Sequence, residues 1–332
     1  MYRSLSFMLP FVCCPPLVQV HAEVQHAVVA EKLDGPTSVA IQPDTGVVFV
    51  AEGGAGQVVR IEDGQPKPVI AGFQKTPPGD DGLSAGSPGL VFFDRHICLV
   101  RSRESLQVFK VPIFNLPGKV PLFKLPEGET ETLSPNSAVS SFKFDETSST
   151  ADDGLAITTA AVYVVSAGQL HWIPINGTKF LPPRQLAESN SPQPTDIRGG
   201  IAISPRGEIV IASSDDTPKM SLSFISANNG RRLLHVPTDL KTITGLAYSR
   251  KSGQLFALDF GDAEHDTGGL YQITAIWRDG KQWGQAKRIT TLARPTAMAF
   301  ANDGSLLVTL LGDRGDSEKR PTGQLIKFEP GL

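Results

Sequence analysis

Cysteine is almost absent from this chain of 332 residues. Only three cysteines occur, and two of them, Cys13 and Cys14, lie within the first 22 residues. Once those residues are removed, Cys98 stands alone, and a single thiol closes no internal disulfide. Packing therefore has to supply the stability. Because Cys98 lies in the apolar run HICLV, we expect a buried and unreactive thiol.

An excess of charge of either sign is also missing. The chain has 31 Lys and Arg against 34 Asp and Glu, which gives a formal net charge of −3. This balance gives no electrostatic reason to expect nucleic acid or an anionic membrane as a partner. Helical periodicity is nearly absent too. The 32 Gly and 26 Pro are instead typical of an all-β protein with many turns.

The first residues have the pattern of an export signal. Arg3 precedes an apolar stretch that runs from Leu5 to Val20. Val20 and Ala22 then provide small residues at the third and first positions before a possible cleavage point. Signal peptidase accepts such residues, so we expect cleavage after Ala22. A retained transmembrane helix is the weaker alternative, since the stretch is short and contains prolines. We expect residues 1–22 to be a signal peptide and residues 23–332 to form one secreted or periplasmic domain without a membrane span.

One strand–turn–strand pattern occurs six times. Its first and last copies are GPTSVAIQPDTGVVFVAEGG, residues 35–54, and RPTAMAFANDGSLLVTLLG, residues 294–312. A third strand usually follows, and several units add a fourth, such as KPVIAGF, KVPLFKLP or RRLLHVP. Units start about 45 to 65 residues apart, a period typical of propeller blades, whereas a sandwich rarely repeats one pattern in this way. The sequence predicts an all-β, six-bladed β-propeller of four-stranded antiparallel blades.

The two ends of the chain predict how the ring closes. EVQHAVVAEKL, residues 23–33, precedes the first unit as an extra strand, and the last unit stops after its third strand, GQLIKFEPGL. An N-terminal strand that completes the last blade would remove two exposed sheet edges. A polar segment at 127–151 interrupts the repeats. Its stretch AVSSFKF alternates like a strand, so we expect an ordered excursion or an extra hairpin over one face.

These repeats resemble the NHL-type and gluconolactonase-like six-bladed propellers. The family's Pro-x-Gly-apolar-Ala motif survives as PTSVA at 36–40, GLA at 245–247 and PTAMA at 295–299. The resemblance covers nearly all of the chain after residue 22, and it implies a fold more than an activity. In this family the beginnings of the first strands and the loops between second and third strands surround the channel on one face. The resemblance therefore places any function on that face.

The gluconolactonase-like enzymes hold a divalent cation with Glu, Asn and Asp side chains where strands begin. Asp34 precedes Gly-Pro much as the family's Glu does, but the hairpin register puts Thr37 at that position. Of the six positions in this chain that correspond to the beginnings of first strands, one carries a carboxylate and three carry threonine, which suits a hard cation poorly. We therefore expect no cofactor, and metal binding stays open. The six corresponding positions in this chain are Thr37, Pro88, Asp153, Gly199, Thr244 and Thr296.

Other enzymatic interpretations also lack their residues. Quinone-dependent sugar dehydrogenases share the fold, and part of their repeat sequence resembles RPTAMAFANDGSLLVT in this chain. Their arginine-rich cofactor pocket and catalytic His have no clear counterpart here. The polar cluster GDAEHDTGG at 261–269 either orients a substrate or calcium, or forms a solvated hairpin tip. Long loops of mixed charge follow the second strands, whereas the turns between first and second strands are short. We expect the loop charges Arg101, Asp259 and Asp262 to be exposed and to contribute little to folding.

The sequence thus predicts an exported, monomeric propeller that binds an unidentified polar small molecule or a protein at its channel face. No catalytic apparatus is evident. The alternatives are a metal-dependent lactonase-like hydrolase or a quinone-dependent sugar dehydrogenase-like enzyme with a rebuilt site, and a structural interaction module of the cell envelope. The candidate ligand-binding residues are Thr37, Glu52, Arg101, Asp153, Thr244, Asp259, Asp262 and Thr296.

Overall fold

The computed structural model describes residues 24–75, 89–102, 105–114, 132–144, 154–166, 169–186, 196–214, 219–261, 268–311 and 322–332. For residues 196–199 it describes the backbone alone. The predicted signal segment lies outside these ranges, and so do the candidate residues Asp153 and Asp262.

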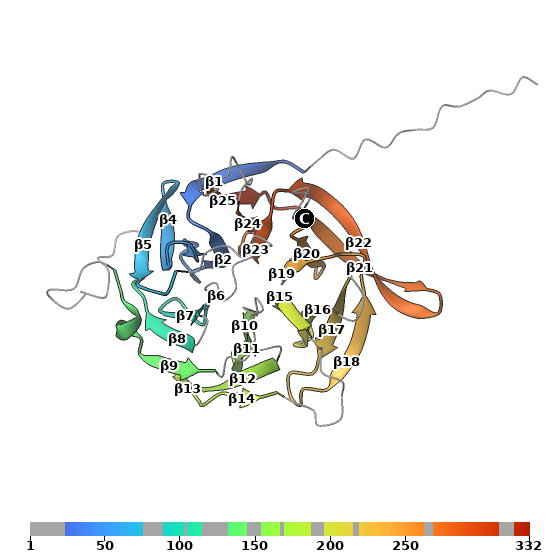
Figure 1. Ribbon diagram of the computed structural model, residues 1–332, viewed down its shortest axis with the longest axis horizontal. Coiled ribbons are helices and arrows are strands. Elements are labelled where there is room, and N and C mark those ends of the chain that lie inside the picture. The colour runs from blue at the N-terminus through green and yellow to red at the C-terminus, as the bar shows by residue number, and fades with distance from the viewer. Residues whose placement is uncertain are drawn as a thin grey trace, which may run out of the picture.

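Six antiparallel sheets form a ring around a central axis, as the repeats predict (Figure 1). In each sheet the first strand is innermost. Blade 1 contains β2 (Pro36–Ile41), β3 (Val48–Glu52), β4 (Gln57–Glu62) and β5 (Gln65–Ala71); blade 2 contains β6 (Gly89–Phe92), β7 (Ile97–Ser102), β8 (Ser105–Lys110) and β9 (Ser140–Lys143); blade 3 contains β10 (Leu155–Ile157), β11 (Ala161–Ser166) and β12 (Gln169–Asn176), with an outer edge divided between β13 (Lys179–Phe180) and β14 (Arg184–Gln185).

The second half of the ring repeats this order. Blade 4 contains β15 (Asp196–Ile203), β16 (Ile209–Ser214), β17 (Met220–Ile225) and β18 (Arg232–Pro237); blade 5 contains β19 (Ile243–Tyr248), β20 (Leu255–Asp259), β21 (Gly268–Arg278) and β22 (Lys281–Leu292); blade 6 contains β23 (Pro295–Phe300), β24 (Leu306–Leu310), β25 (Gly323–Phe328) and β1 (His26–Leu33).

The hydrophobic core lies between the blades. Each second strand is apolar in sequence and buried on both faces, because one neighbouring blade covers either side. Six clusters of buried side chains form, one at each junction between adjacent blades. Cys98 belongs to one of them and is fully buried, and burial raises the pKa of its thiol, which confirms the expected inert cysteine.

Small residues begin the innermost strands because the blades converge there. A Cβ atom on Gly245 would lie 3.2 Å from Leu258 Cδ1 and 3.7 Å from the Cα of Ala297 in the next blade. A Cβ on Gly200 would lie 3.0 Å from the side chain of Ile243. These contacts are tight, so the small residue in the repeated pattern follows from packing.

The turn between first and second strands is short in every blade and is closed in a similar way, although its length differs by one or two residues. One backbone hydrogen bond closes it each time, for example from Gln42 N to Val47 O at 2.9 Å and from Ser249 N to Gln254 O at 2.9 Å. We call the side of the ring that carries these turns the turn face. The opposite side, where first strands begin and second strands end, is the loop face.

The N-terminal strand closes the ring, which confirms the prediction. Strand β1 pairs antiparallel with β25 and completes blade 6, with His26 opposite Phe328 and Leu33 opposite Gly323. The two ends of the chain therefore share one sheet (Figure 1). A single sheet that contains both ends removes the edges that an open ring would expose.

The segment at 127–151 is placed differently from the prediction. Strand β9, which lies inside it, is the fourth strand of blade 2 and pairs with β8. Leu133 also bridges to Ile70 on the outer strand of blade 1. The described part, residues 132–144, therefore completes one blade and ties it to the next, rather than forming a hairpin over one face. KVPLFKLP, the predicted fourth strand, lies outside the described residues.

Blade 5 extends beyond the ring as a long hairpin. Strands β21 and β22 have 11 and 12 residues, whereas β17 and β18 in blade 4 have six each. Figure 1 shows the hairpin leaving the rim. Trp277 is the next-to-last residue of β21, near the turn of the hairpin, and is 76% exposed. The only helix among the described residues is the short 3-10 helix η1 (Pro135–Ser137), and none of their helices could cross a membrane.

Candidate functional site

Polar side chains gather where the second strands reach the loop face. On each first strand, the small residue pairs with a residue of the second strand. Glu52, Ser166, Ser213 and Asp259 all come directly after that paired residue. Arg101 and Thr309 stand one residue earlier, so their side chains leave the strand on its opposite side. All six are buried.

Every buried charged side chain among the described residues belongs to the loop face. The exposed fractions are 2% for Glu52, 2% for Arg101, 6% for Asp259 and 3% for Arg294. A buried charge costs several kcal/mol unless hydrogen bonds or an opposite charge compensate it. The sequence predicted Arg101 and Asp259 to be exposed loop charges, and this was wrong. Both lie near the ends of buried second strands.

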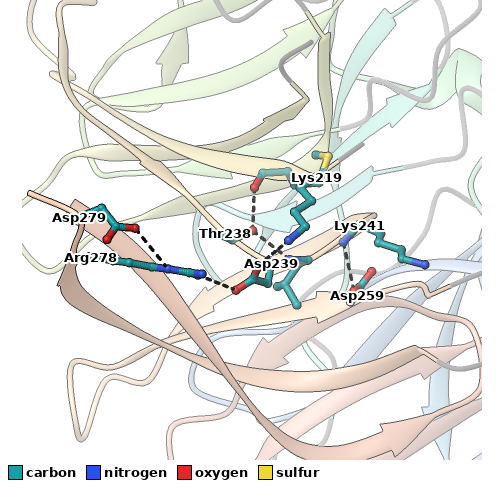
Figure 2. A network of polar contacts seen from close by, with 9 residues as sticks. Lys219, Thr238, Asp239, Lys241, Asp259, Arg278 and Asp279 are labelled. Carbon is teal, nitrogen blue, oxygen red and sulfur yellow. Dashed lines mark hydrogen bonds and ion pairs between the residues drawn. The ribbon is translucent and has the colours of Figure 1, made fainter. Parts of the chain in front are cut away.

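Asp259 holds the connection that leads into blade 5. Its carboxylate accepts hydrogen bonds from the backbone N–H groups of Lys241 (3.3 Å), Thr242 (2.9 Å) and Gly261 (3.2 Å). Figure 2 shows the carboxylate beside Lys241. One side chain therefore fixes both the start of the first strand and the loop after the second.

Glu52 has the same place and the same task in blade 1. Its Oε1 accepts a hydrogen bond from the backbone N–H of Asp34 at 2.8 Å, and its Oε2 accepts one from Gln57 Nε2 at 2.6 Å. Burial raises the pKa of the Glu52 carboxyl above its ordinary value, and the negative charge of Asp34 adds to this rise. Two carboxyl groups therefore lie close together on the loop face, where the chain enters blade 1.

Arg101 joins blade 2 to blade 3. Its Nη2 donates to Ser166 Oγ at 3.2 Å, and its guanidinium lies over the ring of Phe144, 4.8 Å from the centroid. Burial lowers the pKa of His171, and the positive charge of Arg101 lowers it further. An aromatic face and a neighbouring hydroxyl thus stabilise a buried cation.

Arg294 is a residue that the sequence analysis missed. It precedes β23 as Gly35 precedes β2, and both have left-handed backbones, with φ of 49° and 61°. The carbonyls of both accept the same cross-strand hydrogen bond, from Leu311 N at 3.1 Å and from Gly53 N at 2.8 Å. Glycine adopts this conformation freely, whereas a residue with a Cβ loses roughly 1–2 kcal/mol.

The guanidinium of Arg294 lies over the ring of Phe260, 5.5 Å from the centroid. Arg294 therefore combines a strained backbone with a buried positive charge, and it lies on the loop face. A signal for it was present in the sequence: Arg stands in RPT where the first repeat has GPT.

The three described threonines among the candidates link strands through their hydroxyls. Thr296 Oγ1 donates to the carbonyl of Pro36 at 2.8 Å, and Thr244 Oγ1 donates to the carbonyl of Pro295 at 2.8 Å. Both bonds join the first strands of adjacent blades. Thr37 Oγ1 donates to the carbonyl of Ala51 at 3.4 Å, within blade 1. Thr244 and Thr296 therefore tie adjacent blades together through their innermost strands.

These threonines do not fit a divalent cation. They occupy three of the six positions where the resembled lactonases carry metal ligands, and none offers the carboxylate oxygen that a hard cation prefers. Within the described ranges, no three His, Cys, Asp or Glu side chains gather as a metal site. The only carboxylate at these positions, Asp153, lies outside the described residues.

Solved structures share this architecture at low sequence identity. The PQQ-bound aldose sugar dehydrogenase of Streptomyces coelicolor is 13% identical, with a TM-score of 0.57, over 91% of this chain and 96% of that one. The soluble aldose sugar dehydrogenase of Escherichia coli is 11% identical, with a TM-score of 0.53, over 93% and 100%. A gluconolactonase of Xanthomonas campestris is 12% identical, with a TM-score of 0.52, over 92% and 94%.

The chain is thus a six-bladed propeller similar in fold to sugar dehydrogenase and gluconolactonase propellers, as the resemblance implied. No family model and no curated protein matches its sequence. At such identities the likeness concerns the fold, because propellers carry many unrelated functions.

Proposed function

We propose that this protein binds a polyhydroxylated organic molecule, such as a sugar or a sugar-derived lactone, at the loop face of its channel. We also propose that the protein is exported, that it is cleaved after Ala22, and that it acts as a monomer outside the cytoplasm. The observation that carries it is the placement of Glu52, Arg101, Asp259 and Arg294: every buried charge of the described chain lies on one face.

Both signs of charge are present in this group, which bears on the kind of ligand. Two carboxylates accept hydrogen bonds and two guanidiniums donate them. A ligand with many hydroxyl groups can do both, whereas a simple anion or cation would meet as much repulsion as attraction. Ligand sites combine such oriented polar groups with a concave, largely apolar surround.

The strain at Arg294 supports the same proposal. Blade 1 has glycine at the equivalent position, so the fold does not require arginine there. A residue held in an unfavourable backbone conformation is a reason to look for a role beyond folding. The similar sugar dehydrogenase and gluconolactonase folds make sugars and their lactones the first molecules to try.

A lactone hydrolase is the second candidate, and Glu52 is the observation that favours it. Burial raises the pKa of its carboxyl, and a carboxylate with a raised pKa is a better general base. If this candidate is correct, the protein accelerates the opening of D-glucono-1,5-lactone, and Glu52→Gln removes the acceleration. A rate equal to the spontaneous one would exclude this activity.

The binding proposal is tested with D-glucose, D-gluconate and D-glucono-1,5-lactone, by calorimetric titration and by hydrogen-exchange mass spectrometry. We expect one of them to bind and to slow exchange in the peptides around residues 34–37, 52–56, 259–261 and 293–296. The turn peptides 42–47 and 204–208 provide the internal control. Slowed exchange at the turns alone, or binding of none of the three, would contradict the proposal.

A further inference from the structure

A cavity of about 470 Å³ opens on the turn face, at the other end of the channel from the proposed site. The innermost strands of blades 3, 4 and 5 end around it, and the turns that follow β15 and β19 form its rim. Its volume falls within the roughly 300–1,000 Å³ of small-molecule sites.

The walls of this cavity are apolar. Ile157, Ile203 and Leu246 contribute the larger side chains, and Ala202 and Ala247 leave the space between them open. These residues lie in the last three positions of their strands, at the turn face. Such a surface gains most from covering a hydrocarbon body.

Three polar residues stand together on the blade 5 side of the cavity. Tyr248, Ser249 and Arg250 follow one another at the end of β19 and into its turn. Arg250 is exposed, and the contact of its guanidinium is with the neutral amide oxygen of Asn302, at 3.2 Å. That amide accepts a hydrogen bond but brings no negative charge, so the cation can still attract an anion.

Charges of both signs lie around the opening. Arg206 is an exposed cation in the turn of blade 4, next to the lining residue Pro205. Lys251, in contrast, is exposed in the same turn as Arg250 but does not line the cavity. The nearby carboxylate of Glu208 accepts a hydrogen bond from Ser204 Oγ at 2.9 Å, within its own turn. Burial raises the pKa of Tyr248 to about 12, and Glu208 raises it too, so at neutral pH the phenol keeps its proton and can donate.

We propose that this cavity is a second binding site, for an organic anion with an apolar body, such as an aliphatic or aromatic carboxylate. The hydrocarbon part lies against Ile157, Ile203 and Leu246. The carboxylate lies at the rim, where Arg250 and the Tyr248 hydroxyl donate to it. The site is separate from the loop face and does not depend on the function proposed there.

The probe for this proposal is octanoate, titrated into the full-length protein and followed by calorimetry. Arg250→Gln keeps the size of the exposed side chain while it removes the charge, and we expect about a tenfold or greater loss of affinity. Lys251→Gln removes the same charge from the same turn, but Lys251 does not line the cavity, so its affinity should stay near that of the wild type. The neutral analogue 1-octanol should bind more weakly than octanoate.

A second variant tests the cavity itself. Ala247→Phe fills the space between the strands and should abolish octanoate binding, with circular dichroism and thermal melting as the check that the propeller still forms. In NMR spectra, the amide chemical shifts that change when octanoate is added should be confined to residues 202–206 and 246–253. Equal affinity in Arg250→Gln and the wild type would overturn the proposal, as would shifts on the loop face or no binding at millimolar octanoate.

Discussion

The loop face and the turn face are built from the two ends of the same strands, yet their chemistry differs. At the turn face one backbone hydrogen bond recurs in all six blades, and the cavity walls there are apolar. At the loop face each blade differs, and the buried charges of the described chain are found there. The comparison teaches that folding fixes one end of the repeat and leaves the other free to vary.

The physical reason lies in the length and path of the connections. A turn between adjacent antiparallel strands reverses the chain within a few residues, so it needs particular residues such as Gly46, Gly207 and Gly253, all with left-handed backbones. At the loop face the chain passes from one blade to the next. Side chains such as Asp259 and Glu52 hold that passage, and several residue types can do so.

Removal of β1 should have the largest effect, because this strand closes the ring that holds both faces. A chain that lacks residues 23–33 leaves β25 without its outer partner and exposes the edge of that strand. We expect aggregation, or the loss of cooperative unfolding in urea followed by tryptophan fluorescence. Melting and solubility equal to those of the parent chain would mean that closure does not stabilise the ring.

Loss of a buried carboxylate should cost much more than loss of an exposed one. Asp259→Ala leaves the backbone N–H groups of Lys241, Thr242 and Gly261 without their acceptor, and about 2–4 kcal/mol of the free energy of unfolding should be lost. The matched control on the turn face is Asp303→Ala. That carboxylate is more than half exposed, so its removal should cost about 1 kcal/mol or less.

Urea unfolding of the two variants measures this difference. A cost at Asp303 equal to that at Asp259 would remove the energetic distinction between the faces.

Glu52 should make stability depend on pH in a direction opposite to that of most carboxylates. Its pKa in the folded protein lies above the ordinary 4.5, because burial disfavours the charged form. Its contribution to stability is therefore present below the unfolded pKa and is lost as pH rises through the folded pKa.

The Glu52→Gln variant isolates this contribution. The free energy of unfolding of both proteins is measured from about pH 4 to about pH 7. As pH rises, the wild type should lose stability relative to the variant. A shift in favour of the wild type would contradict the assignment.

The ion pairs between Asp239, which follows β18, and its partners Lys219 and Arg278 should have the smallest effect. Asp239 pairs with Lys219 at 2.6 Å and with Arg278 at 3.9 Å, as Figure 2 shows. The pKa of its carboxyl is lowered, first by the hydrogen bond from Lys219. Because the side chains are about half exposed, Asp239→Ala should cost about 0.5 kcal/mol. If Asp239→Ala lowers the free energy of unfolding more than Asp259→Ala does, the exposure of a carboxylate does not predict its contribution to stability.

The sequence predicted the ring, the buried second strands, the small first-strand residues and the closure by β1, because these features repeat at a regular period. It misplaced the outer strand of blade 2, since β9 follows a long polar segment that the period does not anticipate. It also missed Arg294 and expected Arg101 and Asp259 to be exposed. Burial at a strand end depends on the neighbouring blade, and a single repeat carries no sign of that neighbour.

Arg294→Gly tests the central claim, that the loop face carries a ligand-binding function which folding does not require. The change relieves the left-handed strain, loses the contact with Phe260 and frees the unfolded chain, so stability should stay within about 1 kcal/mol of the wild type. Titration of the best-binding molecule among D-glucose, D-gluconate and D-glucono-1,5-lactone should show affinity at least about tenfold weaker. Unchanged affinity, or a variant that fails to fold while Gly35 fills the equivalent position in blade 1, would contradict the account.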